Sequence, residues 1–147
     1  MRTLSIAAAV FAVATIAEAH VTVSPEESRG GAVERYTVRV PTEGQVTTVA
    51  VELEIPQEVT VTSVVVNGGF SYEARREGNR IVGITWKLDI KPAEIGEFAF
   101  FARNPASGQI AWKAHQRFAD GTSADWTGVE GDRRPASVTK ITAARQK

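Results

Sequence analysis

The sequence predicts an all-β fold, an antiparallel β-sandwich. From residue 20 onward, apolar and polar residues alternate with a period of two in short segments, and turn signals rich in Gly, Pro, Asn and Asp separate these segments at near-regular spacing. Beyond residues 1–19 no stretch has a helical period. Eight or nine short strands arranged in this way are typical of two packed antiparallel sheets. With neither long repeats nor a low-complexity linker, residues 20–147 are expected to form one domain.

The first half of the domain contains three predicted strands. Residues 21–24 form a short first strand that ends at Pro25, residues 26–31 a polar turn, and residues 33–40 a half-buried strand. The inward residues of that strand are Tyr36, Val38 and Val40. The turn after it, at residues 41–44, displays Glu43 at a loop tip. In the next strand the inward residues are Val49, Val51, Leu53 and Ile55.

The second half repeats the pattern. A strand over residues 59–66 turns at Asn67-Gly68-Gly69 into residues 70–72, and later strands cover residues 81–90, 95–101, 110–118 and 137–141. Alternation places Trp86 in the core and His115 on the polar face of the strand over 110–118. Asp120-Gly121 is a hairpin turn signal, and Trp126 lies shortly after it.

Composition excludes several classes of function. Seventeen basic and seventeen acidic residues balance, so nothing indicates binding to nucleic acid or to an anionic membrane surface. There is no cysteine, hence neither a disulfide framework nor a thiolate ligand, and Met1 is the only methionine. The remaining metal ligands are imidazole, carboxylate and amine, a set suited to Cu(II), Ni(II) or Zn.

The N-terminal segment has the features of an export signal. Arg2 supplies a positive start, residues 4–16 an apolar stretch too short to span a bilayer, and Ala17 and Ala19 the small residues of a cleavage site. Residues 1–19 are therefore expected to be removed, which makes His20 the first residue of a periplasmic or secreted protein. Its α-amine and imidazole Nδ1 could then chelate a metal. Alternatively, His20 simply follows the cut. No second apolar run has membrane-spanning length.

A search for catalytic patterns finds no nucleophile elbow, no zincin motif and no glycine-rich phosphate loop. With two histidines in the chain, nucleophilic catalysis is not expected, and most carboxylates on a sandwich surface only interact with solvent. His115 could complete a two-imidazole copper site of the kind found in polysaccharide oxygenases, but its predicted place on the polar face favours an ordinary solvated histidine. Trp126 could be core, like most of the three tryptophans, or belong to a site at the loop end.

Four motifs together resemble the YcnI-like copper-binding domain, a bacterial family of exported proteins. They span nearly the whole domain: the signal ending directly before His20-Val21-Thr22-Val23, residues 36–43 (YTVRVPTE), residues 51–56 (VELEIP), and the late pattern Gln116…Phe118…Asp120-Gly121…Trp126-Thr127-Gly128. The resemblance implies an immunoglobulin-like β-sandwich. The sequence departs from many members of the family in having no hydrophobic segment after the domain, so a free periplasmic protein is expected.

The resemblance also implies a copper site. The family binds Cu(II) through a monohistidine brace, which consists of the amine and imidazole of the first mature residue and a glutamate, with a tryptophan beside the metal. Matched by motif, these residues are His20, Glu43 and Trp126. The protonated indole nitrogen is not a normal ligand, so Trp126 is expected to shield the metal or tune it. The motif does not fix the position of His115.

Three functions follow as alternatives. The first is an exported, non-enzymatic copper-binding protein, a metallochaperone or a component of copper acquisition or homeostasis that delivers to a membrane copper transporter or an acceptor cuproprotein. The second is a copper monooxygenase that uses His20 and His115. The third is an immunoglobulin-like interaction domain without a metal, in which His20 is incidental.

Overall fold

The computed structural model describes residues 20–66 and 68–145, and the predicted export signal at residues 1–19 lies outside them. In chain order the described strands are β1 (Thr22–Ser24), β2 (Glu27–Arg29), β3 (Val33–Pro41), β4 (Thr48–Glu54), β5 (Thr60–Val64), β6 (Ser71–Glu77), β7 (Arg80–Ile90), β8 (Ile95–Arg103), β9 (Gly108–Trp112), β10 (Ala114–Phe118), β11 (Ser123–Trp126) and β12 (Ser137–Thr142). None of the described residues belongs to a helix that is long and apolar enough to cross a membrane.

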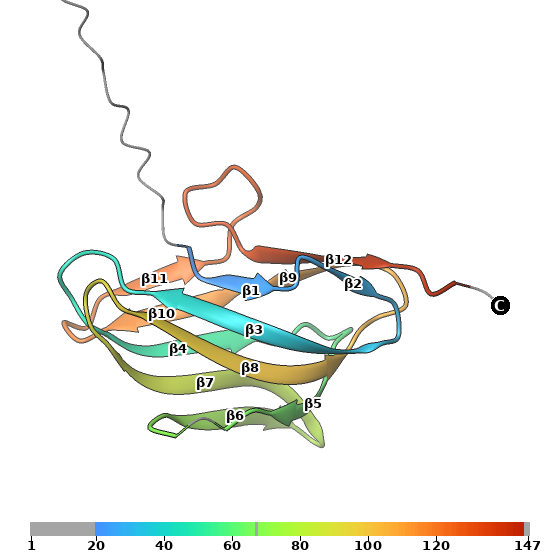
Figure 1. Ribbon diagram of the computed structural model, residues 1–147, viewed down its shortest axis with the longest axis horizontal. Coiled ribbons are helices and arrows are strands. Elements are labelled where there is room, and N and C mark those ends of the chain that lie inside the picture. The colour runs from blue at the N-terminus through green and yellow to red at the C-terminus, as the bar shows by residue number, and fades with distance from the viewer. Residues whose placement is uncertain (1–19, 67, 146–147) are drawn as a thin grey trace, which may run out of the picture.

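Two larger sheets form the predicted sandwich. One has the order β1-β3-β8-β5 and the other β11-β10-β4-β7-β6, and a third sheet, β2-β12-β9, lies along one side (Figure 1). Strands β12 and β1 run side by side, because the Ser137 hydroxyl accepts from Val23 N at 2.9 Å and donates to Val23 O at 3.1 Å. The start of β1 therefore lies beside the base of the loop between β11 and β12 (Figure 1).

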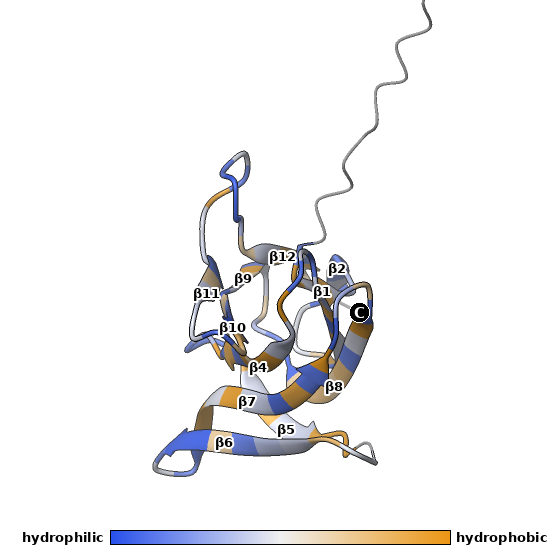
Figure 2. Ribbon diagram, turned by 90° about the vertical axis from the view of Figure 1, so that its left-hand side faces the viewer, coloured by the Kyte–Doolittle hydropathy of each residue, from blue (hydrophilic) through white to orange (hydrophobic). Residues whose placement is uncertain are grey.

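The core fills the space between the two sheets. Strands β7 and β8 carry alternating apolar and polar residues, seen as bands of colour in Figure 2. As predicted, Tyr36, Val38 and Val40 are fully buried, and Trp86 is a core residue that is 2% exposed. Aromatic rings join the layers: Trp86 of β7 lies 5.6 Å from Phe98 of β8, measured between ring centroids. This burial explains the two-residue period of the sequence.

Two strand assignments from the sequence are wrong. Residues 27–29, expected to lie in a polar turn, form β2, which pairs with β12 in parallel, so the sandwich is not purely antiparallel. Short edge strands need no apolar alternation, and for that reason the sequence pattern concealed β2. The single strand expected over 110–118 is two strands. At Lys113 the chain passes from β9, which pairs with β12, to β10, which pairs with β4 and β11.

The inward face of β4 also differs from expectation at the first two residues of the strand, Thr48 and Val49. Val51, Leu53 and Ile55 are buried as predicted, but Val49 is 38% exposed and Thr48 is fully buried. The pairing of β4 with β10 explains this difference: Arg117 pairs with Ala50 and Phe118 with Thr48, so β4 carries one extra residue, and such a bulge reverses which face each preceding side chain occupies. The bulge turns the Thr48 hydroxyl inward, where it contributes to the site.

Candidate metal centre

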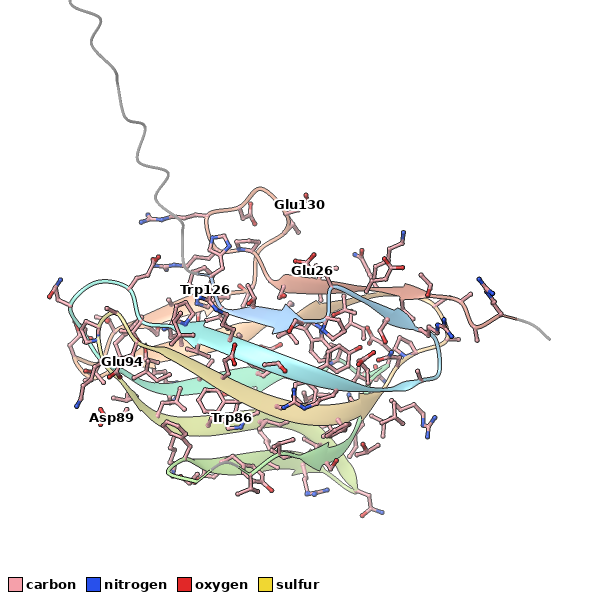
Figure 3. All side chains as sticks on the ribbon, in the orientation of Figure 1. Glu26, Trp86, Asp89, Glu94, Trp126 and Glu130 are labelled. Atoms are coloured by element: carbon pink, nitrogen blue, oxygen red, sulfur yellow. The ribbon has the colours of Figure 1, made fainter. Side chains whose placement is uncertain are left out.

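His20 lies two residues before β1, and the sheet holds the segment that follows it. Val21 and Val23 are buried, and Val23 pairs with Val38 of β3. The half-buried His20 side chain lies against Trp126, with the ring centroids 5.1 Å apart and the planes inclined by 51°. Figure 3 shows Trp126 close to the start of β1, on the same side of the molecule as Glu130 in the following loop.

Trp126 is the last residue of β11 and is 7% exposed. The predicted hairpin turn leads into its strand: Asp120 Oδ1 accepts hydrogen bonds from Thr122 N and Oγ1, and these bonds lower the pKa of Asp120. The indole Nε1–H of Trp126 donates to Gln116 Oε1 at 3.2 Å across the β10–β11 pair. This hydrogen bond fixes the orientation of the ring that His20 contacts.

Gln116 belongs to the site, although the motif analysis assigned it no role. Its side chain is buried, at 2% exposure, and its amide nitrogen donates to Pro41 O at 2.9 Å and to Thr48 Oγ1 at 2.8 Å. These two acceptors flank the loop over residues 42–47. Gln116 therefore connects Trp126 to both ends of the loop that carries Glu43. The available signal was an amide side chain on the inward face of a strand, where a polar group needs partners.

Glu43 lies in that loop, directly after β3. The loop is anchored by Thr42, whose hydroxyl contacts Thr48 Oγ1 at 2.6 Å and donates to Ile90 O at 2.9 Å. The exposed Glu43 side chain lines a pocket of about 280 Å³. The other lining residues are Pro41, Gly44, Gln116, Phe118, Ala124, Trp126, Arg133 and Arg134. Trp126 thus relates the other two residues taken from the motifs to each other. His20 contacts its ring, and Glu43 lines the same pocket.

His20 and Glu43 supply the two ligand side chains, an imidazole and a carboxylate, that the expected brace would use. Within residues 20–66 and 68–145, no three His, Cys, Asp or Glu side chains converge as a metal cage. A monohistidine brace needs only two such side chains, because its third ligand is the α-amine released by cleavage. Two nitrogens and one carboxylate suit Cu(II), which binds N/O ligands most tightly among the divalent first-row metals, whereas structural zinc usually takes four protein ligands.

His115 lies elsewhere. Its neighbours Ala114 and Gln116 face inward, whereas His115 faces outward, as the strand alternation predicted. Its Nδ1 lies 2.7 Å from Asp125 Oδ1 and its Nε2 lies 2.8 Å from Glu54 Oε1. Partial burial lowers the pKa of His115, but the hydrogen bonds to the two carboxylates outweigh it and raise the pKa above its ordinary value. The structure does not bring His115 to His20, which contacts Trp126 on the other face of β11.

The fold and the site define an immunoglobulin-like β-sandwich with one candidate ligand, His20, ahead of its first strand and another, Glu43, in the loop after β3. Residues 20–141 match the family described as Domain of unknown function (DUF1775), and the chain belongs to this family. It is 35% identical over 134 residues to the copper-binding protein CutI of Bacillus subtilis (strain 168), a YcnI-like protein, which confirms the resemblance read from the motifs. That alignment covers 88% of this chain and 66% of CutI, so the chain spans about two thirds of its relative's length.

Solved structures confirm the fold class. An uncharacterized protein from Nocardia farcinica, described as having an immunoglobulin-like fold, superposes with a TM-score of 0.71 at 22% identity, covering 85% of this chain and 99% of that one. A non-cellulosomal cohesin from Archaeoglobus fulgidus superposes with a TM-score of 0.51 at 13% identity, covering 84% and 91%. At these identities the likeness concerns the fold alone.

Proposed function

We propose that this chain is an exported copper-binding protein that holds one Cu(II) per chain at its mature N-terminus. The observation that supports this most is the contact between the His20 and Trp126 rings, together with the pocket that Trp126 shares with Glu43. The family match begins at His20, the residue expected to follow the cleavage site. The relative CutI is named for copper binding.

Each residue has a separate task in this proposal. His20 supplies the imidazole and, after removal of residues 1–19, the α-amine, and Glu43 supplies a carboxylate from the loop after β3. Trp126 covers one side of the site with its ring and is not a ligand, because its protonated indole nitrogen donates to Gln116. Gln116 and Thr42 hold the Glu43 loop in position relative to Trp126, through hydrogen bonds at the ends of that loop.

Copper transfer, not catalysis, is the role we propose. One carboxylate leaves a Cu(II) centre with residual positive charge and open positions, and Glu43 is exposed, so an acceptor can approach the metal directly. We propose a periplasmic or secreted location and delivery to a membrane copper transporter or a cuproprotein. An oxygenase of the two-imidazole kind would need His115, which is held between Glu54 and Asp125 on the opposite face.

A titration with Cu(II) against a competing chelator tests the proposal. The exported protein, the Glu43→Gln variant and a Glu130→Gln control are compared, since Glu130 is an exposed carboxylate in the neighbouring loop. We expect one copper per chain, at least tenfold weaker binding in Glu43→Gln, which is about 1.4 kcal/mol, and a change of less than twofold in the control. Absence of stoichiometric binding in the exported protein would refute the function, and equal loss in both variants would remove Glu43 from the site.

A further inference from the structure

The pocket beside the candidate ligands has an excess of positive charge. Its charged lining residues are Glu43, Arg133 and Arg134, so it is net positive before any metal is bound. A bound Cu(II) would add to this excess. No ion pair within the described part of the chain engages the guanidinium group of Arg133 or Arg134. Two guanidinium groups beside a cation site weaken cation binding unless an anion accompanies the metal.

Arg133 and Arg134 lie in the loop over residues 127–136, which is held in shape by its own hydrogen bonds. Gly128 N donates to Arg134 O at 2.9 Å, and Ala136 N donates to Gly128 O at 2.8 Å, which closes the loop at its base. Near the tip, Asp132 Oδ2 accepts from Val129 N at 2.9 Å. A Cβ atom at position 128 would lie 2.5 Å from Asp132 Oδ2 and 3.0 Å from Arg134 O, so a larger residue there would displace the Asp132 side chain. The arginine backbone is therefore fixed over the pocket by hydrogen bonds on both sides.

We propose that Arg133 and Arg134 form a carboxylate-binding site in this pocket, and that carboxylate and copper bind cooperatively. Guanidinium groups recognise carboxylates through paired N–H donors, which an ammonium group cannot reproduce. A pocket of about 280 Å³ is smaller than those that take drug-sized ligands, so it suits a small carboxylate or a single acidic side chain of a partner protein. Carboxylate binding requires only the two arginines, whereas its coupling to copper rests on the proposed function.

The coupling has a definite sign. An anion on the two arginines offsets the positive charge that opposes the metal, so a bound carboxylate strengthens copper binding. By linkage, bound copper strengthens carboxylate binding by the same factor. An acceptor that presents an acidic side chain would therefore be drawn to the copper-loaded form and would leave after the metal has moved. This arrangement gives transfer a direction without any change of fold.

The test uses the exported protein free of metal and follows the indole N–H resonances by NMR during titration with malonate at constant ionic strength. Trp126 lines the pocket, whereas Trp86 and Trp112 are buried in the core and serve as internal references. We expect a saturable shift of the Trp126 resonance alone. In the double variant Arg133→Gln/Arg134→Gln the same shift should need at least tenfold more malonate, with the two core resonances unchanged.

The matched control is Arg76→Gln on β6, the edge strand opposite β11 in the same sheet, which should behave as the wild type. A second arm replaces malonate by a short blocked aspartate peptide. Binding of the peptide at least as tight as malonate assigns the site to a partner's acidic side chain, and binding of malonate alone assigns it to a free carboxylate. Absence of a Trp126 shift with either probe, or an equal shift in the double variant, would overturn the proposal.

A copper titration in buffer free of carboxylates separates this inference from the proposed function. The double arginine variant should bind Cu(II) more tightly than the wild type, by about threefold or more, because the opposing charges are gone. Unchanged copper affinity would refute the coupling while leaving the carboxylate site. Malonate binding without any copper binding would refute the proposed function and leave the arginine site standing.

Discussion

Replacement of Gln116 by leucine tests how the site is held together. Leucine has a similar size but none of the polar atoms, so the variant loses the hydrogen bonds to Pro41 O, Thr48 Oγ1 and Trp126 Nε1. The indole N–H of Trp126 is left buried without an acceptor, which costs about 2 kcal/mol. The two other losses cost about 1 kcal/mol each, and Thr48 keeps its contact with Thr42.

Burial of the leucine side chain returns about 1–2 kcal/mol, so the net expectation is a loss of about 2–3 kcal/mol in the free energy of unfolding. A domain of this size remains folded after such a loss. Copper binding should weaken on the order of tenfold, because Trp126 and the Glu43 loop are no longer joined. Only the second effect distinguishes a positioning role from a purely structural one.

Urea unfolding and copper titration measure the two effects. The control is Gln109→Leu on β9, an exposed glutamine whose replacement should change stability by less than about 0.5 kcal/mol and leave copper binding unaltered. If Gln116→Leu lost less than 1 kcal/mol and bound copper like the wild type, the hydrogen-bond network would not be what holds the site. A large loss of stability with unchanged copper affinity would limit Gln116 to the fold.

Three further outcomes follow from the same contacts. Trp126→Phe keeps an aromatic ring beside His20 but leaves Gln116 Oε1 without its donor, so it should cost about 1–3 kcal/mol in urea unfolding and change copper affinity less than Glu43→Gln does. His115→Ala should retain one Cu(II) per chain and an unchanged paramagnetic resonance spectrum. Loss of a nitrogen coupling in this variant would instead support the two-histidine copper site. The raised pKa of His115 means that its stabilising contribution is full below about pH 6.5 and is lost as the pH rises through the folded-state pKa. The stability difference between wild type and His115→Gln should therefore be larger near pH 5.5 than near pH 8.5, and a constant difference would contradict the two carboxylate contacts.

The sequence was sufficient for the sandwich because alternation follows burial. Tyr36, Val38 and Trp86 are core residues for the reason their spacing suggested, which is that strand residues two apart share a face. The pattern failed where an element does not bury an apolar face, as in β2, and where a backbone irregularity reverses the alternation, as at Thr48. Neither event leaves a mark in apolar periodicity.

The sequence was enough to name candidate ligands but not the residues that support them. Chelation chemistry drew attention to His20, and motif resemblance supplied Glu43 and Trp126. The hydrogen bonds of Gln116 join its own strand to three others, β3, β4 and β11, so no local pattern reveals them. Arg133 and Arg134 were invisible for a similar reason: a pair of basic residues in a polar loop is ordinary until the fold places it in the pocket with Glu43.

The most direct test of the account compares protein that starts at His20 with protein that starts at Ala19, in a Cu(II) titration against a competing chelator. The α-amine of His20, with an ordinary pKa of about 7.7–8.0, yields its proton to Cu(II) near neutral pH, whereas the amide nitrogen that replaces it is a far poorer ligand. Circular dichroism should show the same fold for both forms. We expect at least a hundredfold weaker binding when Ala19 is retained, or about 2.8 kcal/mol. Equal affinities would show that the N-terminal amine is not a ligand and would contradict the brace.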